Sequence, residues 1–99
     1  MVVYEVNLMV AEDLIEAYLP WLKQHIEEML TFEGFEGADL LCEARTSNAG
    51  SQSFVVHYRL RRISDLERYF EEDAERMRGE GLTRFPSGVR ASRRILTQV

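Results

Sequence analysis

Two stretches of this sequence alternate between apolar and mixed residues, and this alternation constrains the fold more than any other feature. In a β-strand, successive side chains point to opposite faces, so strict alternation indicates a strand with one face in the core. The apolar positions are Val2, Tyr4, Val6, Leu8 and Val10 in the first stretch and Phe54, Val56, Tyr58 and Leu60 in the second. The sequence therefore predicts two strands that each bury one face.

The segments that follow these strands have helical spacing instead. Their apolar stripes consist of Ile15, Tyr18, Leu19, Leu22, Ile26 and Met29, and of Leu66, Tyr69, Phe70, Ala74 and Met77. Segments 13–16 and 64–67 have the spacing of a capping box, in which two side chains satisfy free backbone N–H groups at a helix start. Pro20 predicts a kink in the first helix. Gly79 and Gly81 predict the end of the second helix.

The two remaining strands are shorter. Residues 38–45 follow a turn at residues 34–37 and lead into a second turn at residues 46–51, where Asn48 and Gly50 suit unusual backbone angles. The apolar sides of these strands consist of Ala38, Leu40, Cys42 and Ala44, and of Val89, Ala91 and Ile95. A hairpin between residues 38–45 and the second alternating stretch is therefore predicted.

The resulting order is strand, helix, strand, strand, helix, strand, without repeats or linkers. A chain of 99 residues holds one hydrophobic core, so we expect residues 1–99 to form a single domain. The simplest packing is an α+β, ferredoxin-like βαββαβ fold, a four-stranded antiparallel sheet with both helices on one face. Right-handed crossovers then make the first and third strands the central neighbours.

Charge and composition exclude several classes of protein. The formal net charge is -5, and no cluster of Lys and Arg provides the basic surface that nucleic-acid binding needs. The N-terminus has no signal-peptide pattern, and no apolar run approaches the roughly 20 residues that span a bilayer. Cys42 has no second cysteine to pair with, and its small apolar neighbours predict a buried thiol. We therefore expect a cytoplasmic protein without nucleic-acid or membrane partners.

Two helices cover only one face of such a sheet, and the other face combines apolar and charged residues. Its members include Val3, Met9, Leu41, Val55 and Leu96, together with Glu5, Asn7, Asp39, His57, Arg59 and Arg94. This mixture is too apolar for free contact with solvent and too charged for a dry core. A second copy of the chain laid across this face would bury its apolar side chains, so the sequence predicts a homodimer.

Four segments together resemble a known bacterial family. They are VVYEVNL, WLKQHIEEML followed by GF, VVHYRL, and MRGEGLTRFPSGVRASRRI, and they span nearly the whole chain. The family they resemble has only a domain-of-unknown-function label and is similar to the dimeric α/β-barrel superfamily, which includes the antibiotic-biosynthesis monooxygenases. The resemblance implies a ferredoxin-like fold and a dimer whose two sheets face each other. It implies no established activity.

The candidate ligand-binding residues fall into two groups, and the first lies on the uncovered face. His57 faces Glu5 and Asn7 if the first and third strands are neighbours, and Arg59 lies two residues further along. A carboxylate beside a histidine fixes its tautomer or keeps it protonated, as acid–base catalysis requires. The alternative is a structural cluster, because buried charges are normally paired. We predict that His57 belongs to such a structural cluster.

Trp21 and His25 form the second group, at the edge of the first helical stripe. In some proteins a Trp–His pair flanks an aromatic ligand. In others the pair packs along the edge of a helix and its polar atoms are in water. No metal site is predicted, because the two histidines and one cysteine form no metal-binding motif. No cofactor is predicted either.

Two classes of function remain open after these arguments. The first is a small dimeric domain that binds a small molecule or a protein partner, or that serves only to dimerise. The second is a cofactor-free monooxygenase- or isomerase-like enzyme that acts on a small aromatic or enolic substrate, with His57 or His25 as the base. A mostly apolar cavity with a few convergent polar groups distinguishes a binding protein or an enzyme from a purely structural module.

Overall fold

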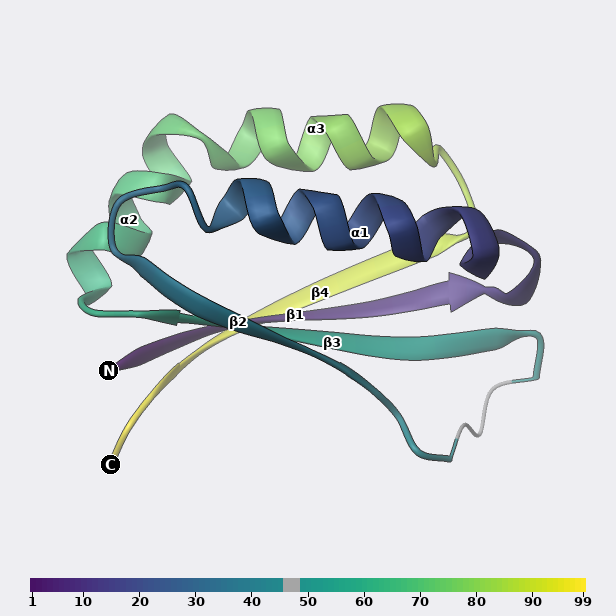
Figure 1. Cartoon of the computed structure of the whole chain (residues 1–99), viewed down its shortest axis with the longest axis horizontal. Helices are drawn as coiled ribbons and strands as arrows, with labels where there is room; N and C mark the ends of the chain where they lie inside the picture. The colour runs from purple at the N-terminus through teal and green to yellow at the C-terminus, as the bar shows by residue number, and fades with distance from the viewer. Residues whose placement is uncertain (46–48) are drawn as a thin grey trace.

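The computed structural model describes residues 1–45 and 49–99 of the chain (Figure 1). Its elements are β1 (Val2–Ala11), the 3-10 helix η1 (Glu12–Leu14), α1 (Ile15–Met29), β2 (Phe35–Cys42), β3 (Ser51–Leu60), α2 (Ile63–Glu72), α3 (Ala74–Arg84) and β4 (Val89–Thr97). The strands form one antiparallel sheet in the order β2-β3-β1-β4. The predicted ferredoxin-like fold, with the first and third strands at its centre, is confirmed.

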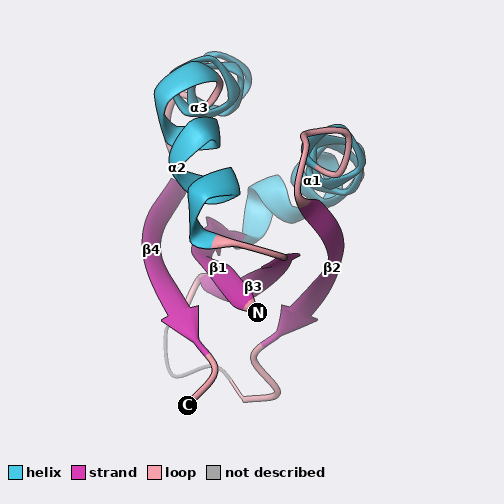
Figure 2. Cartoon of the chain, turned by 90° about the vertical axis from the view of Figure 1, so that its left-hand side faces the viewer, coloured by secondary structure: helices cyan, strands magenta, loops and turns pink. Residues whose placement is uncertain are grey.

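The helices lie on one face of the sheet. Figure 2 shows α1 on the side of β2 and α3 on the side of β4, with the two central strands between them. In the described part of the chain, no helix lies on the opposite face of the sheet, and we call this face the open face. Among the described residues, no helix is long and apolar enough to cross a membrane.

The predicted alternation places the core between the helices and the two central strands. The buried residues on this side of β1 and β3 are Val2, Tyr4, Leu8, Val10, Phe54, Val56, Tyr58 and Leu60, and those of α1 are Tyr18, Leu22, Ile26 and Met29. Burying one large apolar side chain contributes roughly 1.5–3 kcal/mol. The central strands and α1 therefore carry a large share of the stability, as their periodicity indicates.

The second helical segment consists of two helices rather than one. α2 ends and α3 begins at Asp73, whose backbone has φ -128° and ψ -23°. Hydrogen bonds continue on both sides of this residue, from the Asp73 N–H to the Tyr69 carbonyl at 2.9 Å and from the Met77 N–H to the Asp73 carbonyl at 3.0 Å. The apolar stripe also keeps its helical spacing across the junction. Periodicity therefore could not predict the change of direction that Figure 1 shows between α2 and α3.

α3 continues through Gly79 and Gly81, so the predicted helix end at these glycines is wrong. A Cβ atom at Gly81 would lie 3.2 Å from the Cη2 atom of Trp21. The missing side chain therefore lets the indole ring of α1 approach α3 closely. A glycine inside a helix costs about 1 kcal/mol relative to alanine, and the packing of Trp21 offsets part of this cost.

Neither predicted capping box forms. The N-cap residues are Leu14 for α1 and Arg62 for α2, and no described side chain forms a cap hydrogen bond at either helix start. The 3-10 helix η1 precedes α1 and takes the place of a side-chain cap. Pro20 lies inside α1, which continues to Met29, and the kink stays a prediction.

β2 and its neighbouring turn differ in part from the prediction. β2 begins at Phe35, earlier than predicted, because Phe35 pairs with Leu60 of β3. Cys42 is exposed rather than buried. It ends an edge strand, and Figure 1 shows this end of β2 turning away from the helices that cover the core. Gly50 has φ +82°, as its predicted turn position requires, whereas Asn48 lies outside the described residues.

Candidate functional site

The structure separates the predicted ligand-binding residues onto opposite sides of the sheet. Trp21 and His25 lie on α1 and line a cavity between the helices and the sheet. The open-face group consists of Glu5, Asn7, His57 and Arg59. Because the sheet lies between the two groups, they belong to two distinct sites.

Glu5 is the centre of a hydrogen-bonded cluster on the open face. Its Oε1 atom accepts hydrogen bonds from Arg94 Nε at 2.7 Å and from Asn7 Nδ2 at 2.9 Å, and its Oε2 atom lies 2.8 Å from His57 Nε2. A carboxylate only accepts hydrogen bonds, so His57 Nε2 carries the proton in this contact. These contacts, that of Arg94 above all, lower the pKa of Glu5 from 4.5 to about 2.

Strand register explains why this cluster forms. Glu5 of β1 pairs with His57 of β3 on one side and with Arg94 of β4 on the other. Arg59 does not join the cluster and forms an ion pair with Asp39 of β2. The predicted contact between His57 and Glu5 is confirmed, and Asn7 binds the other oxygen of the same carboxylate. Arg59 lies on the same face of the sheet as His57 but outside this cluster.

A cavity of about 330 Å³ lies between α1, α3 and the sheet. Its aromatic lining residues are Tyr4, Tyr18, Trp21, Tyr58, Tyr69 and Phe85. Ligand pockets commonly measure about 300–1,000 Å³, and an engineered cavity of about 150 Å³ binds benzene. The cavity is therefore large enough for a molecule of one or two fused aromatic rings.

Three tyrosines of the cavity have hydroxyl groups that no described residue hydrogen-bonds. Burial raises the pKa of Tyr18 and of Tyr69 to about 12 and also raises the pKa of Tyr58. All three are therefore neutral phenols at physiological pH and can donate a hydrogen bond to a ligand. Tyr4 differs, since its hydroxyl oxygen accepts a hydrogen bond from Arg78 Nη2 at 3.1 Å.

Two arginines bring positive charge to the cavity without a carboxylate partner. Arg78 of α3 and Arg93 of β4 both line it, and neither forms an ion pair with a described residue. The positive charge of Arg93 favours the ionised form of the three buried phenols. It therefore offsets part of the rise in their pKa values that burial causes. An uncompensated positive charge beside a mostly apolar cavity favours a ligand with an anionic group.

His25 presents a free ring nitrogen in the same region. The imidazole stacks on Trp21 with ring centroids 4.8 Å apart and an interplanar angle of 18°. Its Nδ1 atom is buried, and no described residue hydrogen-bonds it. Burial lowers the pKa of His25, so the ring is neutral at physiological pH and one nitrogen keeps a lone pair.

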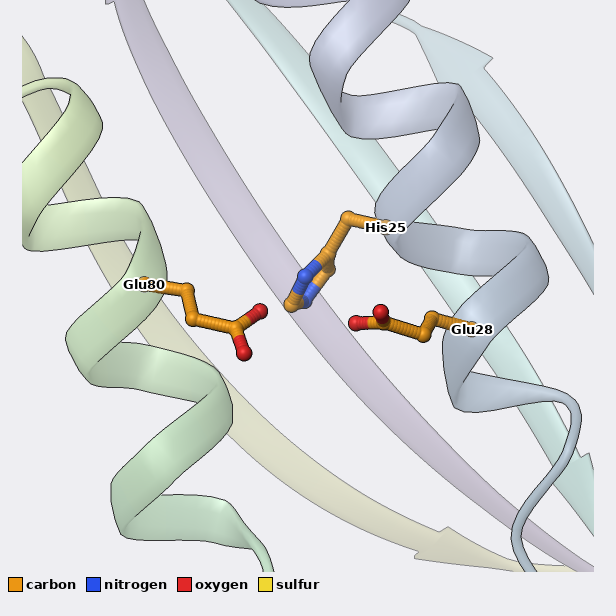
Figure 3. Close-up of side chains that lie close together, drawn as sticks. All are labelled: His25, Glu28 and Glu80. Atoms are coloured by element: carbon orange, nitrogen blue, oxygen red, sulfur yellow. The ribbon is translucent and has the colours of Figure 1, made fainter.

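Two carboxylates lie near the same histidine. Figure 3 shows Glu28 on the helix of His25 and Glu80 reaching toward the ring from α3. One nitrogen of His25 and one oxygen of each glutamate all lie within 4.8 Å of one another. The His-x-x-Glu spacing on α1 was visible in the sequence, but Glu80 joins only because α3 packs beside α1.

Sequence reasoning missed most of the cavity. It assigned the tyrosines to the core, which is correct for Tyr4, Tyr18, Tyr58 and Tyr69, but it gave them no second role. Arg93 had a signal, because it alternates with Ala91 and Ile95 onto the helix side of β4. No local pattern indicates Arg78, which reaches the cavity through the direction of α3.

The whole chain, residues 1–99, matches the family described as a domain of unknown function, DUF4286. The chain belongs to this family. The predicted family resemblance is therefore confirmed, and DUF4286 carries no established activity. No curated protein matches the sequence.

Solved structures of other proteins share the fold of this DUF4286 chain. A mutant of SnoaB, a cofactor-independent oxygenase from Streptomyces nogalater, has a TM-score of 0.71 at 14% identity, over 98% of this chain and 92% of its own. An antibiotic biosynthesis monooxygenase has a TM-score of 0.68 at 14% identity, over 100% and 99%. The de novo designed protein Foldit4 has a TM-score of 0.62 at 21% identity, over 99% and 98%. Since oxygenases and a designed protein share this fold, the fold alone does not identify a function.

Proposed function

We propose that the protein binds a small aromatic molecule with an anionic group in the cavity between α1, α3 and the sheet. The observation that carries this proposal is an aromatic cavity wall next to Arg78 and Arg93, which have no acidic partner among the described residues. Aromatic side chains pack against a ligand ring. Guanidinium groups pair with a carboxylate or a phenolate, and the free tyrosine hydroxyls supply further hydrogen bonds.

The single tryptophan of the chain, Trp21, lines the cavity and provides the assay. Titration with 2-naphthoate should quench its fluorescence, with a Kd on the order of 10–100 μM for a ligand of this size. The uncharged 2-naphthamide should bind at least fivefold more weakly, and Arg93→Gln should remove this difference. Equal binding of the two compounds by the unchanged protein would contradict the charge argument.

A matched pair of variants tests whether the ligand sits in the cavity. Ala91 lines the cavity from β4, and Ser92 is its neighbour on the opposite face of the strand. Ala91→Leu should weaken naphthoate binding at least tenfold because the larger side chain fills the space, whereas Ser92→Leu should change it less than twofold. The proposal fails if no quenching occurs up to 1 mM ligand, or if both variants bind equally well.

We also propose that the protein is a homodimer that pairs through the open face. Two features support this assignment: no helix of the described residues covers the face, and Leu41 near the end of β2 is 49% exposed although it lies within a strand. Exposed apolar strand residues next to paired charges are typical of a protein interface. A second copy would also shield the Glu5 cluster from solvent.

A second candidate function is proton abstraction by His25. Its buried, unpartnered Nδ1 atom at the cavity supports this alternative, as does the fold shared with a cofactor-independent oxygenase. The nitrogen would take a proton from an enolisable substrate, leaving its electron pair on the substrate oxygen. Return of the proton to another carbon completes an isomerisation without an oxidant.

Deuterium exchange into 2-tetralone, followed by NMR, separates this candidate from simple binding. Exchange should be accelerated by the protein and should be lost in His25→Gln. The accelerated rate should fall in acid through the lowered pKa of His25, because protonation removes the lone pair. Binding of 2-naphthoate without any accelerated exchange would leave the protein as a binding protein only.

A further inference from the structure

We propose that His25, Glu28 and Glu80 bind a divalent metal ion, with Zn²⁺ as the best match, between α1 and α3. The three side chains converge from two helices, and their potential ligand atoms lie within 4.8 Å of one another (Figure 3). This site differs from the cavity, because neither glutamate lines that space. The inference goes beyond the proposed binding of an aromatic anion and does not depend on it.

The donor atoms are spaced for an intervening ion rather than for direct hydrogen bonds. Among the described residues, neither glutamate forms a hydrogen bond or an ion pair with His25. Zinc bonds of about 2.0–2.2 Å place the donors of a tetrahedral site roughly 3.4 Å apart. Glu28 and Glu80 are exposed and rotate about several side-chain bonds. Rotation of these side chains therefore brings the donors to zinc-binding distances without movement of the helices.

The charges around the three residues favour a cation. A neutral imidazole and two carboxylates carry two negative charges, which a divalent ion neutralises. No described residue pairs with the carboxylate of Glu28. Glu80 Oε1 accepts a long hydrogen bond of 3.4 Å from Arg76, which also donates to Asp73 Oδ1 at 3.2 Å. Such an exposed pair contributes only about 0.3–0.5 kcal/mol, so Arg76 is a weak competitor.

The donor set selects among metals. One imidazole nitrogen with carboxylates suits Zn²⁺, whereas Mg²⁺ and Ca²⁺ prefer sites built from oxygen alone. Three protein ligands leave a fourth position for water or a ligand, as in catalytic zinc sites. The bound ion would connect α1 to α3 beside the cavity, because His25 also lines it. A zinc-bound His25 keeps its proton on the other nitrogen, so metal binding and proton abstraction by His25 exclude each other.

Calorimetric titration of the full chain with Zn²⁺ tests the site. We expect one ion per chain with a Kd on the order of 10 μM. Glu28→Gln and Glu80→Gln should each weaken binding at least tenfold. Glu27→Gln removes the same charge from the adjacent position of α1, which lies outside the donor group, and should change the Kd less than twofold.

The two histidines provide a second readout in the unchanged protein. Zn²⁺ should shift the NMR resonances of the His25 ring and leave those of His57, on the other side of the sheet, in place. A Kd above 1 mM overturns the proposal, as does a shift at His57 in place of His25. Equal losses in Glu27→Gln and Glu28→Gln also overturn it, because they would indicate an ion attracted by general negative charge.

Discussion

Glu5→Gln is the change that most directly tests the open-face cluster. The substitution keeps the size of the side chain but removes the negative charge that accepts hydrogen bonds from Arg94, Asn7 and His57. The Glu5 side chain is only 7% exposed, so water cannot replace these partners freely. We therefore expect the variant to fold with lower stability at neutral pH.

The lowered pKa of Glu5 sets the size of the effect. A carboxyl whose pKa falls from 4.5 in the unfolded chain to about 2 in the fold stabilises the protein by at most about 3.4 kcal/mol. The side chain of Arg94 is 65% exposed and that of His57 is 32% exposed, so solvent screens the cluster. We expect about 1–2 kcal/mol at pH 7 for the isolated chain.

The pH dependence follows from the direction of the same shift. A depressed pKa contributes stability above the unfolded value of 4.5, and this contribution is lost as the pH falls toward about 2. The difference in unfolding free energy between the unchanged protein and Glu5→Gln should therefore be constant from pH 7 to about pH 5.5. It should shrink by roughly half by pH 3.

Urea unfolding at several pH values between 3 and 7 measures this difference. Glu71→Gln is the control, because Glu71 is an exposed residue of α2 without a partner among the described residues. It should stay within about 0.5 kcal/mol of the unchanged protein throughout. If Glu5→Gln loses stability equally at pH 3 and pH 7, the carboxylate charge does not stabilise the fold and the reasoning is refuted.

Four further substitutions test the interface and the packing. Val55→Asp should turn the proposed dimer into monomers in light scattering, because it places an unpaired charge in the interface; a fully dimeric variant would contradict the open-face interface. Gly34→Ala should cost roughly 2–5 kcal/mol in thermal or urea unfolding, since Gly34 has φ +89° and its new Cβ would lie 2.3 Å from Asp65 Cγ. Gly50→Ala, with φ +82° and no atom of a described residue within 4 Å of the new Cβ, should cost only about 1 kcal/mol, and equal costs would refute the steric argument. Phe70→Ala should cost about 1.5–3 kcal/mol, less than the roughly 3–5 kcal/mol of a fully buried ring, because Phe70 is only partly buried. A loss below about 1 kcal/mol would contradict the packing of its ring against Tyr4, whose ring centroid lies 5.4 Å away.

The open-face cluster was predictable because a strand has an exact side-chain period. Alternation assigns Glu5, Asn7 and His57 to one face, and the order of elements makes β1 and β3 neighbours. The register then pairs Glu5 with His57. The partner of Arg59 was not predictable in this way. Arg59 lies on β3 between β1 and β2, and it forms its ion pair with Asp39 of β2.

The cavity was not predictable in the same way. Its residues His25, Arg78 and Arg93 come from α1, α3 and β4, and their meeting depends on the direction in which each helix crosses the sheet. The bend at Asp73 sets the direction of α3, and the apolar stripe continues through it without a signal. The prediction of a helix end at Gly81 was wrong for a similar reason. The close approach of Trp21 from α1 explains this glycine inside α3, and no pattern within α3 indicates that contact.

Local periodicity therefore determined the strands, the helical stripes, the fold class and the two faces of the sheet, because each depends on the side-chain spacing of a single element. Packing between elements decided everything that needs two helices at a particular distance and angle. The tyrosine-lined cavity with its unpaired arginines is one such feature, and the convergence of Glu80 on His25 and Glu28 is another. A sequence records which face a residue occupies, but side-chain volumes along the whole interface set the helix crossing angle, and no short pattern contains that information.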